Sequence, residues 1–299
     1  MHAHITRRNF MTAAAGATLS FAVHPRALAA EPKGGFDFLV LGDIHHDQLD
    51  HHDFEQLKLD NRKIVPQIEY YCRFTRENTP RLYERLREQV SGNDRIKFVT
   101  QLGDFVQGHA NSLERARKHL SDAIGLVESK EVGVPFFTIK GNHDVTGEGS
   151  VPAYNDVMVP HIKKELKRLP CCAIVVSEPT PEDTSYAYVY GDCLFAYLDT
   201  FSDTGLDWLE ATLAKRTQKH VFVSCHRNAV PNGSRHSWNA YMDNKEDRIR
   251  LYKLLGDNHA VVLSAHVHKH IVLVRKTDGG AFVHVPLCSV NTQLPHVRG

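Results

Sequence analysis

Apolar runs and helix-like segments alternate along the first half of the chain. Three runs rich in β-branched and aromatic residues each end in polar residues, as buried strands do, and lie at 36–43, 96–104 and 134–142. Segments 79–90 and 111–128 repeat apolar residues at helical spacing, and Asn111 or Ser112 suits the N-cap of the second. Strands separated by helices predict a layered α/β fold with parallel strands.

The second half of the chain has more closely spaced strands. Residues 185–200 predict a hairpin that turns at Gly191-Asp192, and a later hairpin turns around 278–280. Two amphipathic helices and two further strands are expected, at 205–215, 244–257, 219–226 and 259–268. Because no internal repeat, low-complexity tract or linker interrupts the pattern, we expect a single α/β domain with a mixed sheet or a pair of sheets.

The N-terminal segment reads as a targeting signal. Arg7 and Arg8 precede a 14-residue apolar run from Phe10 to Val23, which is shorter than the roughly 20 residues that span a bilayer. Small residues then offer cleavage sites after Ala29 or Ala30. The paired arginines resemble a twin-arginine export signal, and an ordinary secretory signal with two arginines is the alternative. We therefore expect a cleavable signal at 1–30, a mature domain at 31–299, export by the twin-arginine machinery and a periplasmic or extracellular location.

Composition narrows the choice of partners. Removal of the three arginines in residues 1–30, which contain no acidic residue, changes the formal charge from +1 to about −2. This near-neutral balance gives no electrostatic argument for nucleic acid or for anchoring to an anionic membrane. Six cysteines remain without a CxxC motif, so neither a zinc ribbon nor a thioredoxin-like motif is supported. Their pairing stays open, although Cys193, Cys225 and Cys288 beside apolar runs favour buried thiols.

Candidate metal ligands recur where predicted strands end. Five strand ends each carry oxygen- or nitrogen-bearing side chains: Asp43 and His45; Asp104; Asn142 and His143; His226; and His266 and His268. Carboxylate, amide and imidazole ligands suit Mn, Fe or Zn, and the absence of thiolate ligands disfavours a structural zinc site. A carboxylate that bridges two cations gives a dinuclear centre suited to in-line displacement at phosphorus.

This ordered set resembles the calcineurin-like metallophosphoesterase superfamily, from about Phe36 to Val290. The resemblance implies a four-layer αββα sandwich with two mixed β-sheets. It implies two metal ions, one held by Asp43, His45 and His268, the other by Asn142, His226 and His266, with Asp104 as the bridge. His143 would contact the phosphoryl group or protonate the leaving oxygen. A metal-bridging hydroxide would then hydrolyse a small-molecule phosphomonoester or phosphodiester by in-line attack.

Several positions depart from the superfamily pattern. Ala265 stands where the last motif usually begins with glycine. Gln107 replaces the tyrosine ligand of purple acid phosphatases, and the pair Gln107-Gly108 replaces the acid and arginine of Ser/Thr protein phosphatases, so both branches are disfavoured. Arg227 follows the lone histidine and could contact substrate phosphate, with a solvated surface arginine as the alternative.

Several features leave alternatives open. A non-catalytic extracytoplasmic protein that binds a metal or ligand on the same fold is the rival function. His46, His51 and His52 are expected to be loop residues rather than a third metal site. The insertion at 47–78 caps the site or packs outside it, and the loop at 229–243, with Trp238 and Tyr241, is placed to shape a substrate pocket.

Overall fold

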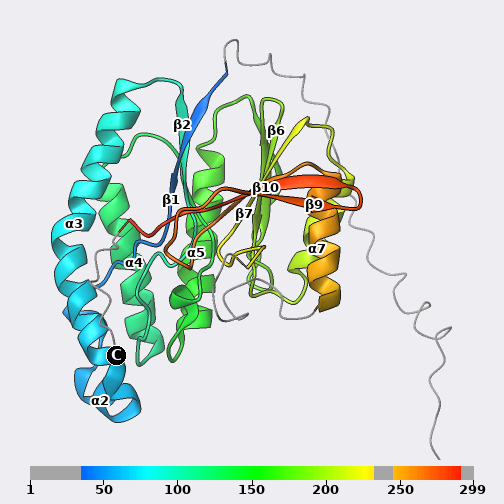
Figure 1. The fold of residues 1–299 in the computed structure, drawn as a ribbon. Helices are drawn as coiled ribbons and strands as arrows, with labels where there is room; N and C mark the ends of the chain where they lie inside the picture. Colours follow the sequence, from blue (N-terminus) through cyan, green and yellow to red (C-terminus); the bar gives the residue numbers. More distant parts are fainter. Residues whose placement is uncertain (1–34, 232–244, 291–299) are drawn as a thin grey trace, which may run out of the picture. The chain divides into compact units, whose positions relative to one another are not determined.

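The computed structural model describes residues 35–231 and 245–290 of the chain, which form two β-sheets with helices on their outer faces (Figure 1). The first sheet has three parallel strands in the order β1-β2-β3. Their bounds are β1 (Asp37–Leu41), β2 (Ile96–Gln101) and β3 (Phe136–Thr138). Each strand ends shortly before a glycine, namely Gly42, Gly103 or Gly141, so the candidate metal ligands lie in the turns beyond the strands.

The second sheet has seven strands in the order β4-β5-β6-β7-β8-β10-β9. The strands are β4 (Ala173–Ser177), β5 (Tyr186–Tyr190), β6 (Cys193–Leu198), β7 (His220–Cys225), β8 (Val261–Ser264), β9 (Leu273–Thr277) and β10 (Gly280–Pro286). The central strands β6, β7, β8 and β10 are parallel, and the outer pairs at both edges are antiparallel. Both predicted hairpins are present, as β5–β6 and β9–β10.

Helices cover the outer face of each sheet. The three-stranded sheet packs against α3 (Val65–Gly92), α4 (Leu113–Ser129) and α5 (Ser150–Lys167) through one apolar cluster. The seven-stranded sheet packs against α6 (Gly205–Ala214) and α7 (Lys245–Asp257) through another. In Figure 1, α3 and α7 lie on opposite sides of the two sheets.

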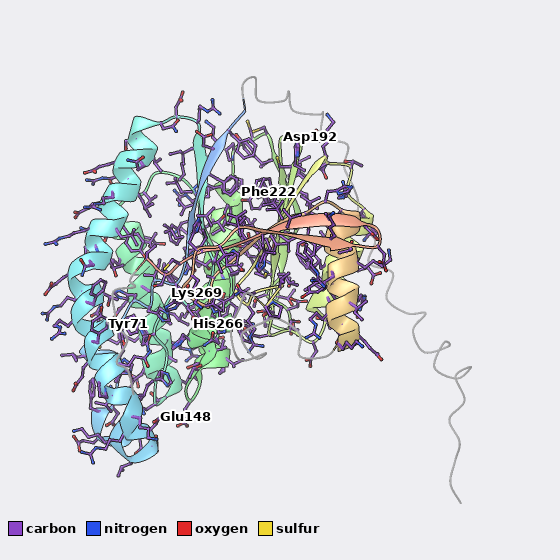
Figure 2. All side chains as sticks on the ribbon, in the orientation of Figure 1. Tyr71, Glu148, Asp192, Phe222, His266 and Lys269 are labelled. Atoms are coloured by element: carbon purple, nitrogen blue, oxygen red, sulfur yellow. The ribbon has the colours of Figure 1, made fainter. Side chains whose placement is uncertain are left out.

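Aromatic side chains fill the layer between the sheets. Phe98 and Phe137 from the first sheet meet tyrosines and phenylalanines of the second, and Phe222 lies in the same layer (Figure 2). Hydrogen bonds cross this layer, because the Tyr186 hydroxyl donates to the Thr138 carbonyl at 2.8 Å and the hydroxyls of Thr100 and Tyr197 lie 2.7 Å apart. Three apolar layers thus separate four layers of secondary structure, which confirms the predicted α/β fold with two sheets.

Helix α3 corrects one sequence-based prediction. A helix was expected to begin at residue 79, but α3 begins at Val65 and continues through Pro80. Its buried positions recur every three or four residues over the whole length, and they include Ile68, Cys72, Thr75, Thr79 and Tyr83. The continuous buried face stabilises the helix across the proline, which normally disfavours a helix interior because it removes a backbone hydrogen bond.

The sequence did not predict the short helical elements that precede α3 and follow β3, but it did predict the N-cap of α4. The short helix α2 (Phe54–Asn61) and the 3₁₀ turns η1 (Leu49–His51) and η2 (Arg62–Ile64) lie within the 47–78 insertion, and η3 (His143–Val145) follows β3. Ser112 is the N-cap of α4, since its hydroxyl accepts the Arg115 N–H at 3.2 Å. Trp238, Tyr241 and residues 1–30 lie outside the described residues.

All six cysteines lie in the described ranges and form no disulfide there; Cys225 is buried and Cys193 and Cys288 are half-buried. Within the residues that the structure describes, no helix combines the length and apolar character needed to cross a membrane.

Candidate metal centre

Five strand ends from both sheets bring the predicted ligands together. Asp43 and His45 follow β1, Asp104 follows β2, Asn142 and His143 follow β3, His226 follows β7, and His266 and His268 follow β8. The carboxyl ends of parallel strands share one edge of a sheet, so ligands from separate strands converge there. Every predicted metal ligand therefore lies at this edge, and the structure brings the whole set together.

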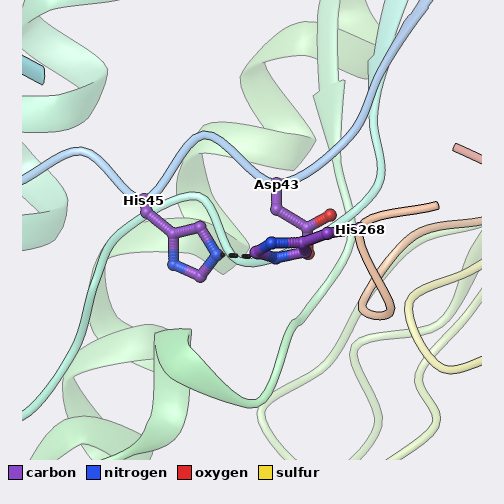
Figure 3. Close-up of side chains that lie close together, drawn as sticks. All are labelled: Asp43, His45 and His268. Atoms are coloured by element: carbon purple, nitrogen blue, oxygen red, sulfur yellow. Dashed lines mark hydrogen bonds and ion pairs between the residues drawn. The ribbon is translucent and has the colours of Figure 1, made fainter. Parts of the chain in front are cut away.

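One group of ligands consists of Asp43, His45 and His268 (Figure 3). The Nε2 atoms of His45 and His268 lie 3.2 Å apart, and His268 Nε2 lies 3.7 Å from Asp43 Oδ1. The Asp43 carboxylate also accepts the backbone N–H of His266 at 3.1 Å, which fixes its orientation. These separations match those of side chains that share one cation.

The second group contains Asn142, His226 and His266, with Asp104 beside them. His226 Nε2 lies 3.0 Å from Asn142 Oδ1 and 3.2 Å from Asp104 Oδ2. The opposite ring nitrogen of His226 donates its hydrogen to the Leu102 carbonyl at 2.8 Å. Metal-binding histidines commonly donate their other N–H in this way, because it fixes the tautomer and aims the free lone pair at the ion.

Asp104 faces both groups. Its Oδ2 atom lies 3.2 Å from His226 Nε2 and 3.9 Å from His45 Nε2, while its Oδ1 atom accepts the His143 backbone N–H at 2.8 Å. One carboxylate between two sets of imidazoles is the arrangement that a bridging ligand requires.

The backbone is held in an uncommon conformation at these ligands. His45, Asp104, His266 and His268 have positive φ values of 51°, 51°, 69° and 51°. Such left-handed geometry is unfavourable for residues with a Cβ and concentrates at functional sites. Hydrogen bonds hold it in place, because the Asp104 carbonyl accepts the N–H groups of Ile44 and His45 at 3.0 and 2.9 Å.

Two glycines permit the close packing of the motifs. A Cβ on Gly141 would lie 2.0 Å from the Asp104 nitrogen, and one on Gly103 would lie 2.6 Å from His226 Nδ1. Any larger residue would therefore displace a ligand. Ala265 is tolerated at the position where the superfamily usually has glycine; it is buried, and its N–H donates to the His226 carbonyl at 3.0 Å.

The charges at the site favour a cation. Asp43 and Asp104 are buried, and within the described ranges their ion-pair partners are all imidazoles. Burial, together with repulsion from Asp104, raises the pKa of Asp43 to about 8. Asp104 and Asp43 in turn outweigh the effect of burial on His226 and raise its pKa to about 9, so this imidazole supplies part of the counter-charge. Ions bound to these oxygen and nitrogen donors would supply the rest.

His143 lies at the side of this set with one ring nitrogen engaged. Its Nδ1–H donates to the Gln107 carbonyl at 2.7 Å, which directs Nε2 away from the backbone. Its ring packs edge-on against His45, with centroids 4.7 Å apart. The Gln107 side chain is buried, and neither of its amide atoms has a hydrogen-bond partner among the described residues. Gln107 therefore contributes its carbonyl to the positioning of His143.

Sequence reasoning missed two residues that support the site. Asp144 accepts the N–H groups of Val106 and Gly141 at 3.0 and 2.8 Å, which ties the loop after β3 to the loop after β2. Tyr71 of α3 packs its ring 4.8 Å from that of His45, so the 47–78 insertion covers the first ligand loop. Asp144 directly follows the predicted His143 in the sequence, so its position was a usable signal, whereas no local signal marks Tyr71.

Comparison with known families agrees with this geometry. The family model described as calcineurin-like phosphoesterase matches residues 36–270. The chain belongs to the calcineurin-like phosphoesterase family. The match covers all five strand ends, and the family implies a pair of divalent metal ions, for which the side chains described above are candidate ligands.

Solved structures share the family fold at low sequence identity. A dimetal phosphatase from Danio rerio is 15% identical, with a TM-score of 0.57 over 87% of this chain and 90% of that one. PhoD is 13% identical, with a TM-score of 0.53 over 85% of this chain and 56% of that one. A search of curated proteins found no match. At these identities the structural likeness shows the fold alone.

Proposed function

We propose that this calcineurin-like phosphoesterase is a dinuclear-metal enzyme that hydrolyses a small-molecule phosphomonoester or phosphodiester. The observation that carries the proposal is the position of Asp104, whose Oδ2 faces a histidine of each ligand group. When bound, the two ions supply an activated water and neutralise charge on the phosphoryl oxygens. Mn, Fe and Zn all suit the donor set.

The ligand assignment follows the two groups of side chains. Asp43, His45 and His268 would hold one ion, Asn142, His226 and His266 would hold the other, and Asp104 would be the ligand shared by both. The buried hydrogen bonds of Asp43, Asp104 and His226 to backbone groups keep these donors in place before an ion binds.

His143 is the proposed general acid. Its Nδ1–H is held by the Gln107 carbonyl, so Nε2 carries the exchangeable proton and presents it to the leaving oxygen. The geometry supports this role, because the backbone N–H of His143 also bonds to Asp104 and thereby fixes the residue against the bridging carboxylate.

Arg227 is the proposed phosphate contact. Its guanidinium lies 4.4 Å from the centre of the Phe201 ring, and its positive charge adds to burial in lowering the pKa of His266 to about 3. Arg227 directly follows the proposed ligand His226 in the chain, and a guanidinium at this position can bind phosphoryl oxygens. The contact with Phe201 restricts the side chain to that position.

The test of the function uses the purified protein loaded separately with Mn, Fe or Zn. Hydrolysis of p-nitrophenyl phosphate and bis-p-nitrophenyl phosphate is measured for the unmodified chain, for Asn142→Ala and for His220→Ala. His220 is an exposed histidine at the start of β7, so its replacement controls for a general effect of removing an imidazole. We expect metal-dependent turnover that Asn142→Ala abolishes and His220→Ala retains.

The same measurement separates the alternatives. The ratio of the two rates assigns the enzyme to the monoester or the diester class. Two bound metals without turnover of either ester, or of a wider panel of phosphoesters, would favour the non-catalytic metal- or ligand-binding protein. Absence of stoichiometric metal would contradict both readings.

We further propose that residues 1–30 are a cleavable twin-arginine signal, that 31–299 is the catalytic domain, and that the enzyme acts in the periplasm or outside the cell. The paired Arg7 and Arg8 ahead of a short apolar run support this location. Folding and metal loading before export would be a consequence of that route.

A further inference from the structure

A second cluster of imidazole and carboxylate groups lies beside the loop that carries His45. We call it the Asp47 cluster; its members are Asp47, His51, His52, Cys72 and His119, and all of them are buried. They come from the loop after β1, from η1, from α3 and from α4. The sequence predicts His51 and His52 to be loop residues rather than metal ligands; in the structure both are buried, and His51 ends the 3₁₀ turn η1.

The spacing of donors in the Asp47 cluster resembles that of the dinuclear centre. Asp47 Oδ1 lies 3.3 Å from His119 Nε2 and 3.5 Å from His51 Nδ1. Ligands about 2.0–2.1 Å from a tetrahedral ion are separated by roughly 3.3–3.4 Å. His52 differs, because its Nε2 lies 2.7 Å from the same oxygen and donates a hydrogen bond to it.

The other atoms of these side chains form a suitable second shell. His51 Nε2–H donates to the Asp122 carboxylate at 2.9 Å, which is the carboxylate–histidine arrangement common behind metal ligands. Asp47 Oδ2 is buried and has no hydrogen-bond partner among the described residues. An ion would replace two existing contacts, that of His51 Nδ1 with the Gln48 N–H at 3.1 Å and that of His119 Nε2 with the His46 carbonyl at 2.7 Å.

The charge of Asp47 is also balanced differently from that of buried carboxylates elsewhere. Asp199 pairs with Lys140 at 2.6 Å, and Glu165 pairs with Arg168 at 2.6 Å. In the described ranges Asp47 pairs only with histidines, as Asp43 and Asp104 do. No lysine or arginine pairs with Asp47 in those ranges, so a bound cation has a place as the counter-charge of this carboxylate.

A cavity lies beside the Asp47 cluster. It has a volume of about 520 Å³, and its wall includes His46, Cys72 and Thr75. Thr75 is hydrogen-bonded to the backbone of Asp47 at 3.0 Å, so the cavity reaches the residues next to the carboxylate. The cavity therefore lies directly beside the Asp47 cluster, and Cys72 belongs to both.

We propose that Asp47, His51 and His119 bind a third divalent cation, of the zinc class, separate from the dinuclear pair. Two imidazoles and a carboxylate are a common zinc-binding set, and the neighbouring Cys72 thiol makes the surroundings suitable for a borderline-soft ion. The ion connects the loop after β1, which carries His45 and Asp47, to His119 on helix α4. Its role is structural, and it does not depend on the proposed hydrolytic activity.

The decisive experiment locates the ions directly. Crystals of the full chain grown with zinc are dialysed against zinc-free buffer, and anomalous diffraction is measured above and below the zinc edge. We expect a peak between Asp47 Oδ1, His51 Nδ1 and His119 Nε2 in addition to the peaks at the dinuclear centre. Peaks at the dinuclear centre alone, or no peak at either place, would overturn the proposal.

Metal content of the soluble protein provides an independent test. After zinc loading and dialysis, we expect three zinc ions per unmodified chain, two for His119→Ala and three for His270→Ala, a control with an exposed histidine. The variant Asp104→Asn weakens the dinuclear centre and should retain the third ion. If His119→Ala and the unmodified chain hold equal zinc, the Asp47 cluster is a hydrogen-bonded network only. Loss of zinc confined to Asp104→Asn would instead leave the dinuclear centre as the sole site.

Discussion

The buried aspartates of this molecule have different roles because their hydrogen-bond and ion-pair partners differ. Asp144 accepts two backbone N–H groups and serves as a brace between loops, whereas Asp104 faces imidazoles from both ligand groups. Asp199 is held by a lysine. A carboxylate that is buried among imidazoles, with no lysine or arginine partner in the described ranges, is suited to bind a metal, and this distinction separates the candidate ligands from the structural acids.

Replacement of His143 by alanine should test its role as a proton donor. We expect His143→Ala to lower kcat by about 10²–10⁴-fold on an alkyl phosphate, whose leaving oxygen must be protonated. The loss should be much smaller on p-nitrophenyl phosphate, because p-nitrophenolate leaves without a proton. Steady-state kinetics on both esters measure the difference.

The control for His143→Ala is its metal content. His143 is not among the proposed ligands, so the variant should hold as much metal as the unmodified chain. An equal loss of rate on both esters would show that His143 binds the phosphoryl group rather than protonating the leaving oxygen.

Gly141 should tolerate no side chain. A Cβ there would approach the Asp104 nitrogen to 2.0 Å and Oδ1 to 2.3 Å, so Gly141→Ala must displace the bridging carboxylate. We expect a loss of unfolding free energy of about 1–3 kcal/mol, as for other overpacked sites, together with reduced metal binding. Urea denaturation of the metal-free protein measures the first effect and metal analysis the second.

Gly125→Ala is the matched control. Gly125 lies inside α4, and a Cβ there would have no atom within 4 Å. The substitution should raise the unfolding free energy by about 0.5–1 kcal/mol, because alanine favours a helix interior. Equal behaviour of the two alanine variants would mean that the loop at Gly141 can move aside at no cost.

At the scale of elements, strands and hairpins were predictable because their signals are local. The apolar runs of β1, β2 and β3 were recognised, although each prediction extended into the polar turn beyond the strand. Helix α3 was recognised only from residue 79, since Pro80 resembles a helix start and the preceding segment is largely polar. Its true beginning at Val65 depends on a face that is buried only in the folded molecule.

The buried ion pair of Lys140 and Asp199 links the two sheets outside the aromatic layer. Lys140 follows β3 and Asp199 follows β6, and the pair is 2.6 Å long with little exposure of either side chain. Lys140→Met should cost about 3–5 kcal/mol of unfolding free energy, because it leaves the Asp199 charge buried without a partner. Urea denaturation at pH 7 measures the cost.

An exposed ion pair provides the comparison for Lys140. Lys164 and Glu128 lie 2.7 Å apart with side chains 60% and 48% exposed, so Lys164→Met should change stability by less than about 1 kcal/mol. If both methionine variants lost equally little unfolding free energy, other groups would have to stabilise the Asp199 charge. One such group is the Thr184 hydroxyl, which donates to Asp199 at 2.7 Å.

For the whole molecule, the ligand set was predictable because each ligand follows a strand within a short motif. The supporting contacts were not. His51 lies in η1 and His119 on α4, and only the packing of α4 against the loop after β1 brings both side chains to Asp47. Likewise, Tyr71 reaches His45 from a helix whose beginning was misplaced. Short motifs thus identify the ligands, because each ligand follows directly from a strand. Contacts between elements that are distant in the sequence depend on tertiary packing, which the sequence pattern does not show.

The proposed export route makes a prediction about the full-length chain. Arg7→Lys with Arg8→Lys keeps the positive charge ahead of the apolar run but removes the arginine pair that the twin-arginine machinery reads. When the chain is expressed in a bacterium that has this machinery, we expect the double variant to accumulate in the cytoplasm at full length, while the unmodified chain reaches the periplasm in a shortened form. Arg26→Lys, which lies beyond the apolar run, should be exported normally. Fractionation and mass measurement of the exported protein give both the location and the cleavage point, and export of the double variant at the normal level would identify the ordinary secretory route instead.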